Sequence, residues 1–190
     1  MLLSVASYGQ TFISSVPYTI TDPGTYVLAD NLRYCFPSGA AIEINSSSVT
    51  LDFRGLFVAS TAASPQNYGV AVNQVRNVTI ENGTLAGFYY DMYFSNGSGD
   101  PANNAGHIVE NMRITHSSVA VQLDFRSGCL IRNNYINGFS TRFPVGVYLD
   151  GGGGNQLLRN RVLNCYEGIA AFEGNSLESN FELCIRFGHG

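Results

Sequence analysis

An asparagine followed three residues later by isoleucine or leucine recurs five times between residues 82 and 180. The phrases are ENGTL at Asn82, ENMRI at Asn111, RNNYI at Asn133, RNRVL at Asn160 and SNFEL at Asn180. Successive phrases lie 20 to 29 residues apart. A period of this length indicates a chain built from similar short units that stack on one another.

Short β-type runs surround each phrase. One precedes it (NVTI, HIVE, CLIR, QLLR, SLES), another lies further upstream (AIEI, GVAV, DMYF, AVQL, GVYL, GIAAF), and a third follows. Apolar and polar residues alternate with period two, whereas the 3.6-residue period of helices is nearly absent. We therefore predict an all-β, right-handed parallel β-helix of about six coils with three short strands per coil, since crossovers of this kind are right-handed. Stacked asparagine amides are expected to form a ladder along one corner.

The glycine-rich stretch LDGGGGNQLLRN, residues 149–160, fits one corner of such a coil. A phosphate-binding loop needs a following helix, but QLLRNRVL has strand character. A hairpin needs an antiparallel return strand, yet the pattern resumes in the same sense. We interpret the run as the corner between the first and second strands of one coil.

Charge and hydropathy exclude several classes of function. All ten basic residues are arginine and the net charge is −4, so there is no phosphate-loop or Schiff-base lysine. The arginines do not cluster into the basic stripe typical of nucleic-acid-binding proteins. No apolar run reaches the roughly 20 residues of a membrane-spanning helix. We expect neither nucleic acid nor membrane as a partner.

The predicted organisation is a single domain. Residues 1–40 form an N-terminal segment and cap, and residues 41–190 form the β-helix. The C-terminal end lacks an evident cap, so we expect either a longer protein, with a further domain there, or self-association through this end. No convincing signal peptide is visible, and the expected location is secreted, periplasmic or on the cell surface.

The cysteines and histidines give no metal site. Cys35, Cys129, Cys165 and Cys184 match no zinc-ligand spacing, and neither His107 nor His116 has a spaced partner. The expected role of the cysteines is that of buried, small apolar side chains. A Cys165–Cys184 disulfide is the alternative, because the repeat brings these segments together.

Residues 38–185 resemble the pectin-lyase-like superfamily of right-handed parallel β-helices. The stretch NVTIENGTLAGF, residues 77–88, is especially similar to repeats of uncharacterised β-helix proteins, and PYTITDPGTYVLADNL, residues 17–32, resembles their N-terminal segment. The resemblance implies the fold but not one activity, because this scaffold carries lyases, hydrolases, epimerases, adhesins and inert spacers.

Candidate functional residues lie along the first strand of each coil. Period two places Glu43, Ala71, Tyr93, Gln122 and Tyr148 outward in successive coils. Tyr93, Gln122 and Tyr148 are the predicted substrate-binding residues, because tyrosine and amide groups suit sugar rings.

Asp124 and Asp150 occupy the same LD position in adjacent coils, and strands lie about 4.8 Å apart. Such a pair suits mutual pKa elevation, a shared Ca²⁺, or the carboxylates of a retaining glycosidase. Arg126 would bind a uronate or assist a lyase. Ordinary Asx-turn chemistry also explains an aspartate at this position.

Two functions follow. The first is a non-catalytic, carbohydrate-contacting β-helix module of an extracellular or surface protein that binds polysaccharide. The alternative is a polysaccharide lyase or glycoside hydrolase acting on acidic glycan, with Asp124, Asp150 and Arg126 as catalytic residues. The sequence identifies no definite cofactor, and calcium is the one candidate.

Overall fold

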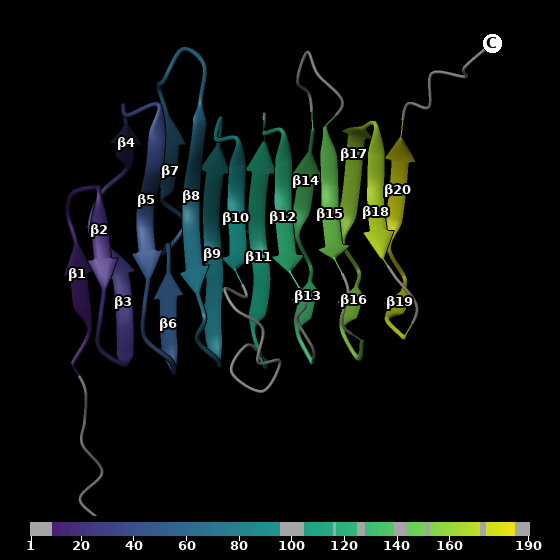
Figure 1. Cartoon of the computed structure of the whole chain (residues 1–190), viewed down its shortest axis with the longest axis horizontal. Coiled ribbons are helices and arrows are strands. Elements are labelled where there is room, and N and C mark those ends of the chain that lie inside the picture. Colours follow the sequence, from purple (N-terminus) through teal and green to yellow (C-terminus); the bar gives the residue numbers. More distant parts are fainter. Residues whose placement is uncertain are drawn as a thin grey trace, which may run out of the picture.

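The computed structural model describes residues 9–95, 105–115, 117–124, 128–138, 144–150, 153–171 and 174–184. Within these residues the chain forms β-strands and no α-helix, and so no helix that could cross a membrane. All strand pairs are parallel (Figure 1). The predicted all-β parallel β-helix is confirmed.

Two parallel sheets wrap around one elongated core. The seven-stranded sheet takes one strand from each coil: β2 (Tyr18–Ile20), β5 (Ser38–Ile44), β8 (Gln66–Asn73), β10 (Tyr90–Ser95), β12 (Val119–Asp124), β15 (Val145–Asp150) and β18 (Glu167–Ala171). The thirteen-stranded sheet is made of β1 (Thr11–Ile13), β3 (Gly24–Leu28), β4 (Leu32–Tyr34), β6 (Val49–Asp52), β7 (Phe57–Ser60), β9 (Val78–Ala86), β11 (Ile108–Thr115), β13 (Leu130–Arg132), β14 (Tyr135–Asn137), β16 (Gln156–Leu158), β17 (Arg161–Cys165), β19 (Ser176–Glu178) and β20 (Phe181–Cys184).

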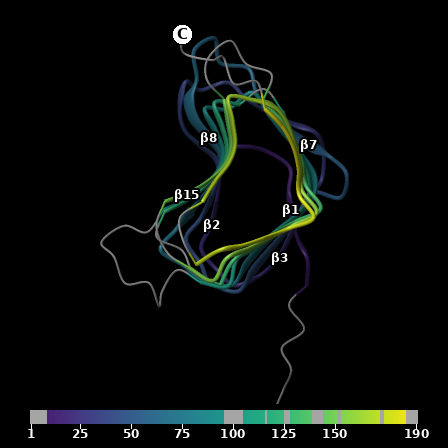
Figure 2. The same cartoon turned by 90° about the vertical axis from the view of Figure 1, so that its right-hand side faces the viewer.

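Each coil runs once around the core. A strand of the seven-stranded sheet is followed by two strands of the thirteen-stranded sheet, as in β12, β13 and β14. In two coils the second and third strands merge into one long bent strand, β9 or β11. Viewed along the axis, the coils superpose as one closed outline (Figure 2). The glycine run connects β15 to β16, so it is the predicted corner, although residues 151–152 lie outside the described residues.

A single left-handed residue makes the bend between the second and third strands. Backbone φ there is 52° to 59° in coil after coil, at Arg54, Asn82, Asn111, Asn133, Arg159 and Ser179. Asparagine tolerates this region better than most residues because its short polar side chain bonds locally. The recurrent asparagines at 82, 111 and 133 are therefore explained first by backbone conformation.

The amide ladder lies one residue further along the chain. Asn160 Nδ2 donates to Asn180 Oδ1 at 3.0 Å, and Asn134 Nδ2 donates to Asn160 Oδ1 at 3.0 Å. Each rung also donates to a backbone carbonyl one coil back, as Asn160 does to Ile131 at 2.8 Å. The predicted coil-to-coil amide bonds are present, but in two adjacent rows: Asn111 Nδ2 donates to Asn82 Oδ1 at 3.2 Å at the bend, whereas Asn160 and Asn180 belong to the row one residue further along.

The core is apolar and continuous along the axis. Inward-facing valine, isoleucine and leucine fill it, together with the fully buried rings of Phe53, Phe88 and Phe94. The last coil differs, since Leu177, Phe181 and Leu183 are 53%, 54% and 58% exposed. In the rest of the molecule, burial of such side chains against a neighbouring coil is stabilising. Among the described residues, the last coil has a neighbouring coil on one side only.

The four cysteines are free thiols. Cys129 and Cys165 are buried as predicted, Cys184 is half-buried, and Cys35 is exposed, contrary to the expectation of burial. Cys165 and Cys184 are direct neighbours on β17 and β20 but are not joined by a disulfide. Burial raises the pKa of the Cys165 thiol to about 12.

Candidate functional site

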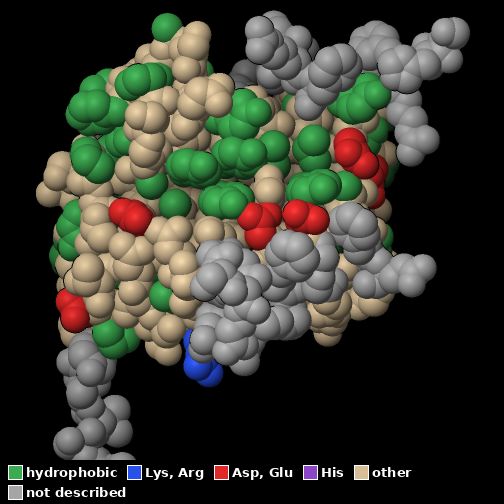
Figure 3. Space-filling view, in the orientation of Figure 1, with side chains coloured by type: hydrophobic (Ala, Val, Ile, Leu, Met, Phe, Trp, Pro, Cys, Tyr) green, Lys and Arg blue, Asp and Glu red, His purple; other side chains and the backbone are tan. Residues whose placement is uncertain are grey.

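The strand register aligns the predicted outward residues. Glu43, Ala71, Tyr93, Gln122 and Tyr148 are Cα partners on consecutive strands of the seven-stranded sheet. All five positions lie on one sheet row that runs along the axis. In the orientation of Figure 1, hydrophobic side chains form a band across this face and acidic side chains follow its lower margin (Figure 3).

Four tyrosines form a cluster on this face. The rings of Tyr68 and Tyr90 are stacked with centroids 5.4 Å apart, and Tyr93 lies 5.3 Å from both. Tyr89 meets Tyr90 edge-on at 4.8 Å. We call these four residues the tyrosine cluster. All are half-buried, so each leaves part of its ring in contact with solvent.

Sequence reasoning found only Tyr93 of this cluster. The reason is that β10 buries two consecutive residues, Asp91 and Met92, so Tyr90 points outward where strict alternation turns it inward. Other strands of this sheet repeat the pattern, as β12 and β15 do. Because two consecutive residues of β10 are buried, Tyr90 lies on the outer face, where it is the Cα partner of Tyr68 on β8.

Asp124 is held by two neighbours on the same face. Tyr93 Oη donates to Asp124 Oδ2 at 2.5 Å, and Gln122 Nε2 donates to Asp124 Oδ1 at 2.7 Å. Burial raises the pKa of Tyr93, and the hydrogen bond to Asp124 and its charge raise it further, so Tyr93 stays protonated and keeps donating. Asp124 thus fixes the ring and the amide that were predicted to contact substrate.

Asp124 and Asp150 are Cα partners on β12 and β15, as predicted. No group among the described residues hydrogen-bonds the Asp150 carboxylate. The third predicted catalytic residue, Arg126, lies outside the described residues. The structure therefore brings together the two aspartates, Tyr93 and Gln122, with Tyr148 beside Gln122.

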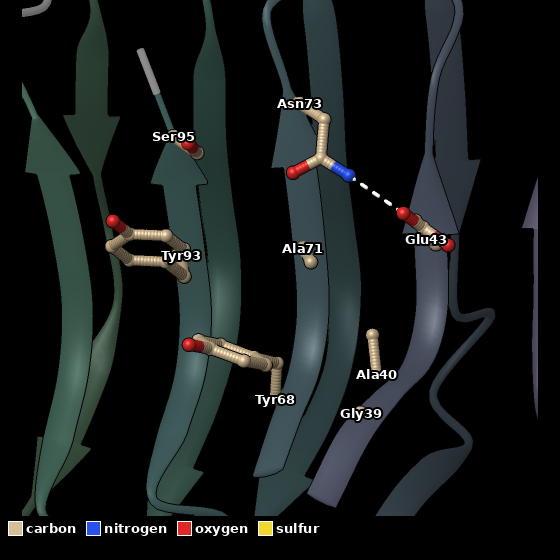
Figure 4. Close-up of a pocket in the computed structure, with 8 residues that line it drawn as sticks. All are labelled: Gly39, Ala40, Glu43, Tyr68, Ala71, Asn73, Tyr93 and Ser95. Atoms are coloured by element: carbon tan, nitrogen blue, oxygen red, sulfur yellow. Dashed lines mark hydrogen bonds between the residues drawn. The ribbon is translucent and has the colours of Figure 1, made fainter. Parts of the chain in front are cut away.

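A shallow hollow of about 270 Å³ lies beside the tyrosine cluster. Tyr68 and Tyr93 form one side, Glu43 and Asn73 the other, and the small side chains of Ala40 and Ala71 leave the space between them (Figure 4). Asn73 Nδ2 donates to Glu43 Oε1 at 2.8 Å and to Asn45 Oδ1 at 3.0 Å, which fixes the polar side. The hollow offers aromatic rings and oriented polar groups to one ligand.

The charge on this face is negative. The outward carboxylates of its strands are Glu43, Asp124, Asp150 and Glu167. Every described arginine lies either on the thirteen-stranded sheet or at a corner, never on a strand of the seven-stranded sheet. Among the described residues, no cluster of three or more His, Cys, Asp or Glu side chains could hold a metal ion.

Of His107 and His116, the structure describes only His107. His107 is buried against the Phe94 ring, with centroids 5.0 Å apart, and its Nδ1 accepts from the Val78 amide at 3.4 Å. His116 lies outside the described residues. His107 therefore has a structural role at the corner before β11.

The family model described as "Right handed beta helix region" matches residues 38–188. No curated protein and no solved structure matches this chain. The match covers every residue of the outward row, the tyrosine cluster and the hollow.

Proposed function

This chain belongs to the right-handed β-helix family, and from that premise we propose that it is a non-catalytic module that binds polysaccharide. The binding surface is the outer face of the seven-stranded sheet. Its centre is the hollow between Tyr68, Tyr93 and Glu43. We further propose a secreted, periplasmic or cell-surface location, where such polymers occur.

The observation that carries this proposal is the composition of the hollow. Sugar rings present an apolar face of C–H groups and a rim of hydroxyls. Tyr68 and Tyr93 offer ring surface to the first, and the oriented Glu43–Asn73 pair offers an acceptor and donors to the second. The parallel coils add Gln122 and Tyr148 along the same row, which suits an extended chain.

The rigidity of these groups also supports binding. Tyr93 is fixed by Asp124, and its ring is packed against Tyr68 and Tyr90. Side chains that are already ordered lose little conformational entropy when a ligand binds, so more of the contact energy appears as affinity.

The test is binding of neutral oligosaccharides by calorimetry, with tyrosine variants. We expect Tyr68→Ala to weaken binding tenfold or more, which corresponds to about 1.4 kcal/mol. Tyr135→Ala is the matched control, since Tyr135 lies on the thirteen-stranded sheet and packs under Arg113. Equal losses in both variants, or no binding to any glycan, would overturn the proposal.

An enzymatic function is the second candidate, and one observation favours it. Asp124 and Asp150 are direct neighbours, at about the separation of adjacent strands, which suits a pair of catalytic carboxylates. Against this, both oxygens of Asp124 already accept hydrogen bonds from Tyr93 and Gln122. Hydrogen bonds to both oxygens lower the nucleophilicity of the carboxylate, so a structural role for Asp124 fits better.

Turnover assays separate the two functions. Pectin and alginate are incubated with the protein, while product absorbance reports lyase action and reducing ends report hydrolysis. A lyase or hydrolase would show turnover that Asp150→Asn and Arg126→Ala abolish. A binding module shows none, and its affinity for glycan is unchanged by Asp150→Asn. Calcium removal with a chelator tests the one candidate cofactor in the same assays.

A further inference from the structure

We infer that the polysaccharide recognised at the hollow carries protonated amino groups, as a partly or fully deacetylated amino-sugar polymer does. This inference rests on the proposed function, because it names the substrate class of the same surface. It runs against an acidic glycan, for which Arg126 would supply the binding charge.

The first support is the sign of the charge around the hollow. Glu43 lines the hollow, and Asp124 accepts the hydrogen bond of Tyr93. Asp150 is the partner of Asp124 on the next strand. No described arginine lies on a strand of this sheet, and Arg76 lies at the corner that follows β8. A uronate polymer bound along the row would place its carboxylates against the carboxylates of the protein. Like charges at short range repel.

The second support is the hydrogen bonding of Glu43. Its Oε1 accepts from Asn73 Nδ2, and no described group hydrogen-bonds Oε2. The carboxylate therefore keeps one oxygen without a partner among the described residues, and the asparagine fixes the orientation of the group. An ammonium group on a sugar ring is the donor best suited to such an oxygen, since charge-assisted hydrogen bonds are the stronger kind.

The third support is the arrangement of the rings. Tyr68 and Tyr93 border the hollow on the side opposite Glu43, with their hydroxyl ends pointing away from Glu43 (Figure 4), and Tyr90 packs against both rings. Aromatic rings attract cations, so the rings that border the hollow favour a cationic sugar over a neutral one. A neutral sugar gains only the stacking and the hydrogen bonds.

The experiment compares three oligosaccharides of equal length by calorimetry: glucosamine hexamer, its fully N-acetylated counterpart, and oligogalacturonate. Measurements are made at a mildly acidic pH, where the amine is protonated, at low and at high salt. We expect the glucosamine hexamer to bind at least about tenfold more tightly than the acetylated hexamer. The advantage should shrink in high salt, because salt screens exposed charges.

Two glutamate variants isolate the charge at the hollow. Glu43→Gln should abolish the difference in affinity between the glucosamine hexamer and the acetylated hexamer, because glutamine keeps a hydrogen-bonding oxygen and loses the charge. Glu178→Gln, which removes the same charge from β19 on the other sheet, is the control and should leave that difference unchanged. Thermal unfolding of both variants checks that the fold is retained.

The outcomes distinguish this inference from the function beneath it. Equal or tighter binding of the acetylated or the acidic hexamer overturns the inference and leaves carbohydrate binding intact. Absence of binding to all three overturns the proposed function, and the inference with it. Polylysine that competes as well as glucosamine hexamer would overturn the inference in favour of a general attraction for cations.

Discussion

The same corner of the β-helix is filled in two different ways along its length. At the bend between the second and third strands, the N-terminal coils use an apolar filling, in which the Phe53 side chain occupies the space over Gly83. The C-terminal coils use the amide ladder of Asn134, Asn160 and Asn180. The two meet at Met112, whose backbone amide donates to Asn134 Oδ1 at 2.9 Å.

The difference teaches that one backbone path can be supported by shape or by hydrogen bonds. Phe53 excludes water and requires a glycine opposite it. Any Cβ at position 83 would collide with the Cβ of Phe53. The ladder requires no glycine, but every rung must find its donors and acceptors in the next coil. Each region should therefore fail under a different substitution.

Asn160→Leu should have the largest effect. It removes the acceptor for the backbone and side-chain amides of Asn134 and the donor to Ile131, all buried. Each unsatisfied buried group costs about 1–3 kcal/mol, so we expect a loss of about 3 kcal/mol or more in the free energy of unfolding, measured with urea. Asn180→Leu, at the less buried last rung, is the comparison and should cost clearly less.

Gly83→Ala tests the apolar region. A Cβ there would lie 2.0 Å from Phe53 Cβ, so the strand must shift, and overpacking of this kind costs about 1–3 kcal/mol. Gly153→Ala is the matched control, since the nearest atom to its Cβ would lie at 3.6 Å. Equal stability of the two variants would contradict the assignment of Phe53 as the filling of this corner.

Asp91→Asn tests a buried polar group outside the ladder. Neither carboxylate oxygen of Asp91 has a hydrogen-bond partner among the described residues. Burial raises the pKa of Asp91 well above its ordinary value, and interactions with the Ser117 side chain and the Phe88 backbone only partly offset this.

The sign of the pH dependence follows from that direction. The folded state holds the proton more tightly than the unfolded state, so stability is greatest at acid pH and falls as the pH rises through the ordinary carboxyl range toward the raised pKa. Asp91→Asn should remove this fall and stabilise the protein at neutral pH by about 1 kcal/mol or more. Parallel pH profiles for the two proteins would contradict the prediction.

Arg159→Asn should have the smallest effect, and it should be stabilising. Arg159 is exposed and holds φ at 53° in the bend, where the other coils often use asparagine. Asparagine visits this conformation more readily, so we expect a gain of up to about 1 kcal/mol in the free energy of unfolding. Arg159→Ala removes the same side chain without that tolerance and should show no gain.

Much of this architecture could be predicted from the sequence, because stacking of like residues on like residues leaves a visible period. The outward row through Glu43, Tyr93 and Tyr148 and the pairing of Asp124 with Asp150 follow from counting along strands. The tyrosine cluster was missed because a strand that buries two neighbours in succession breaks the count. The ladder was predicted as one row and forms two, because the bend and the rung are adjacent positions and asparagine suits each for a different reason.

The hydrogen-bond partners within the candidate site could not be read from the sequence. The interaction of Tyr93 with Asp124 joins two strands across a diagonal, and the interaction of Glu43 with Asn73 does the same. Side-chain reach and rotamer decide such contacts, and spacing alone does not encode them.

The amide ladder gives the molecule a sense of direction. Each rung receives its acceptor from the coil that follows it, so Asn134 relies on Asn160, and Asn160 relies on Asn180. Fraying of the final coil would first remove the hydrogen-bond acceptor of the amides in the preceding coil. The loss of acceptors would then spread toward the N-terminus, one coil at a time. Exchange of backbone amide hydrogens should accordingly be fastest near β20. It should become progressively slower toward the coil that contains Phe53.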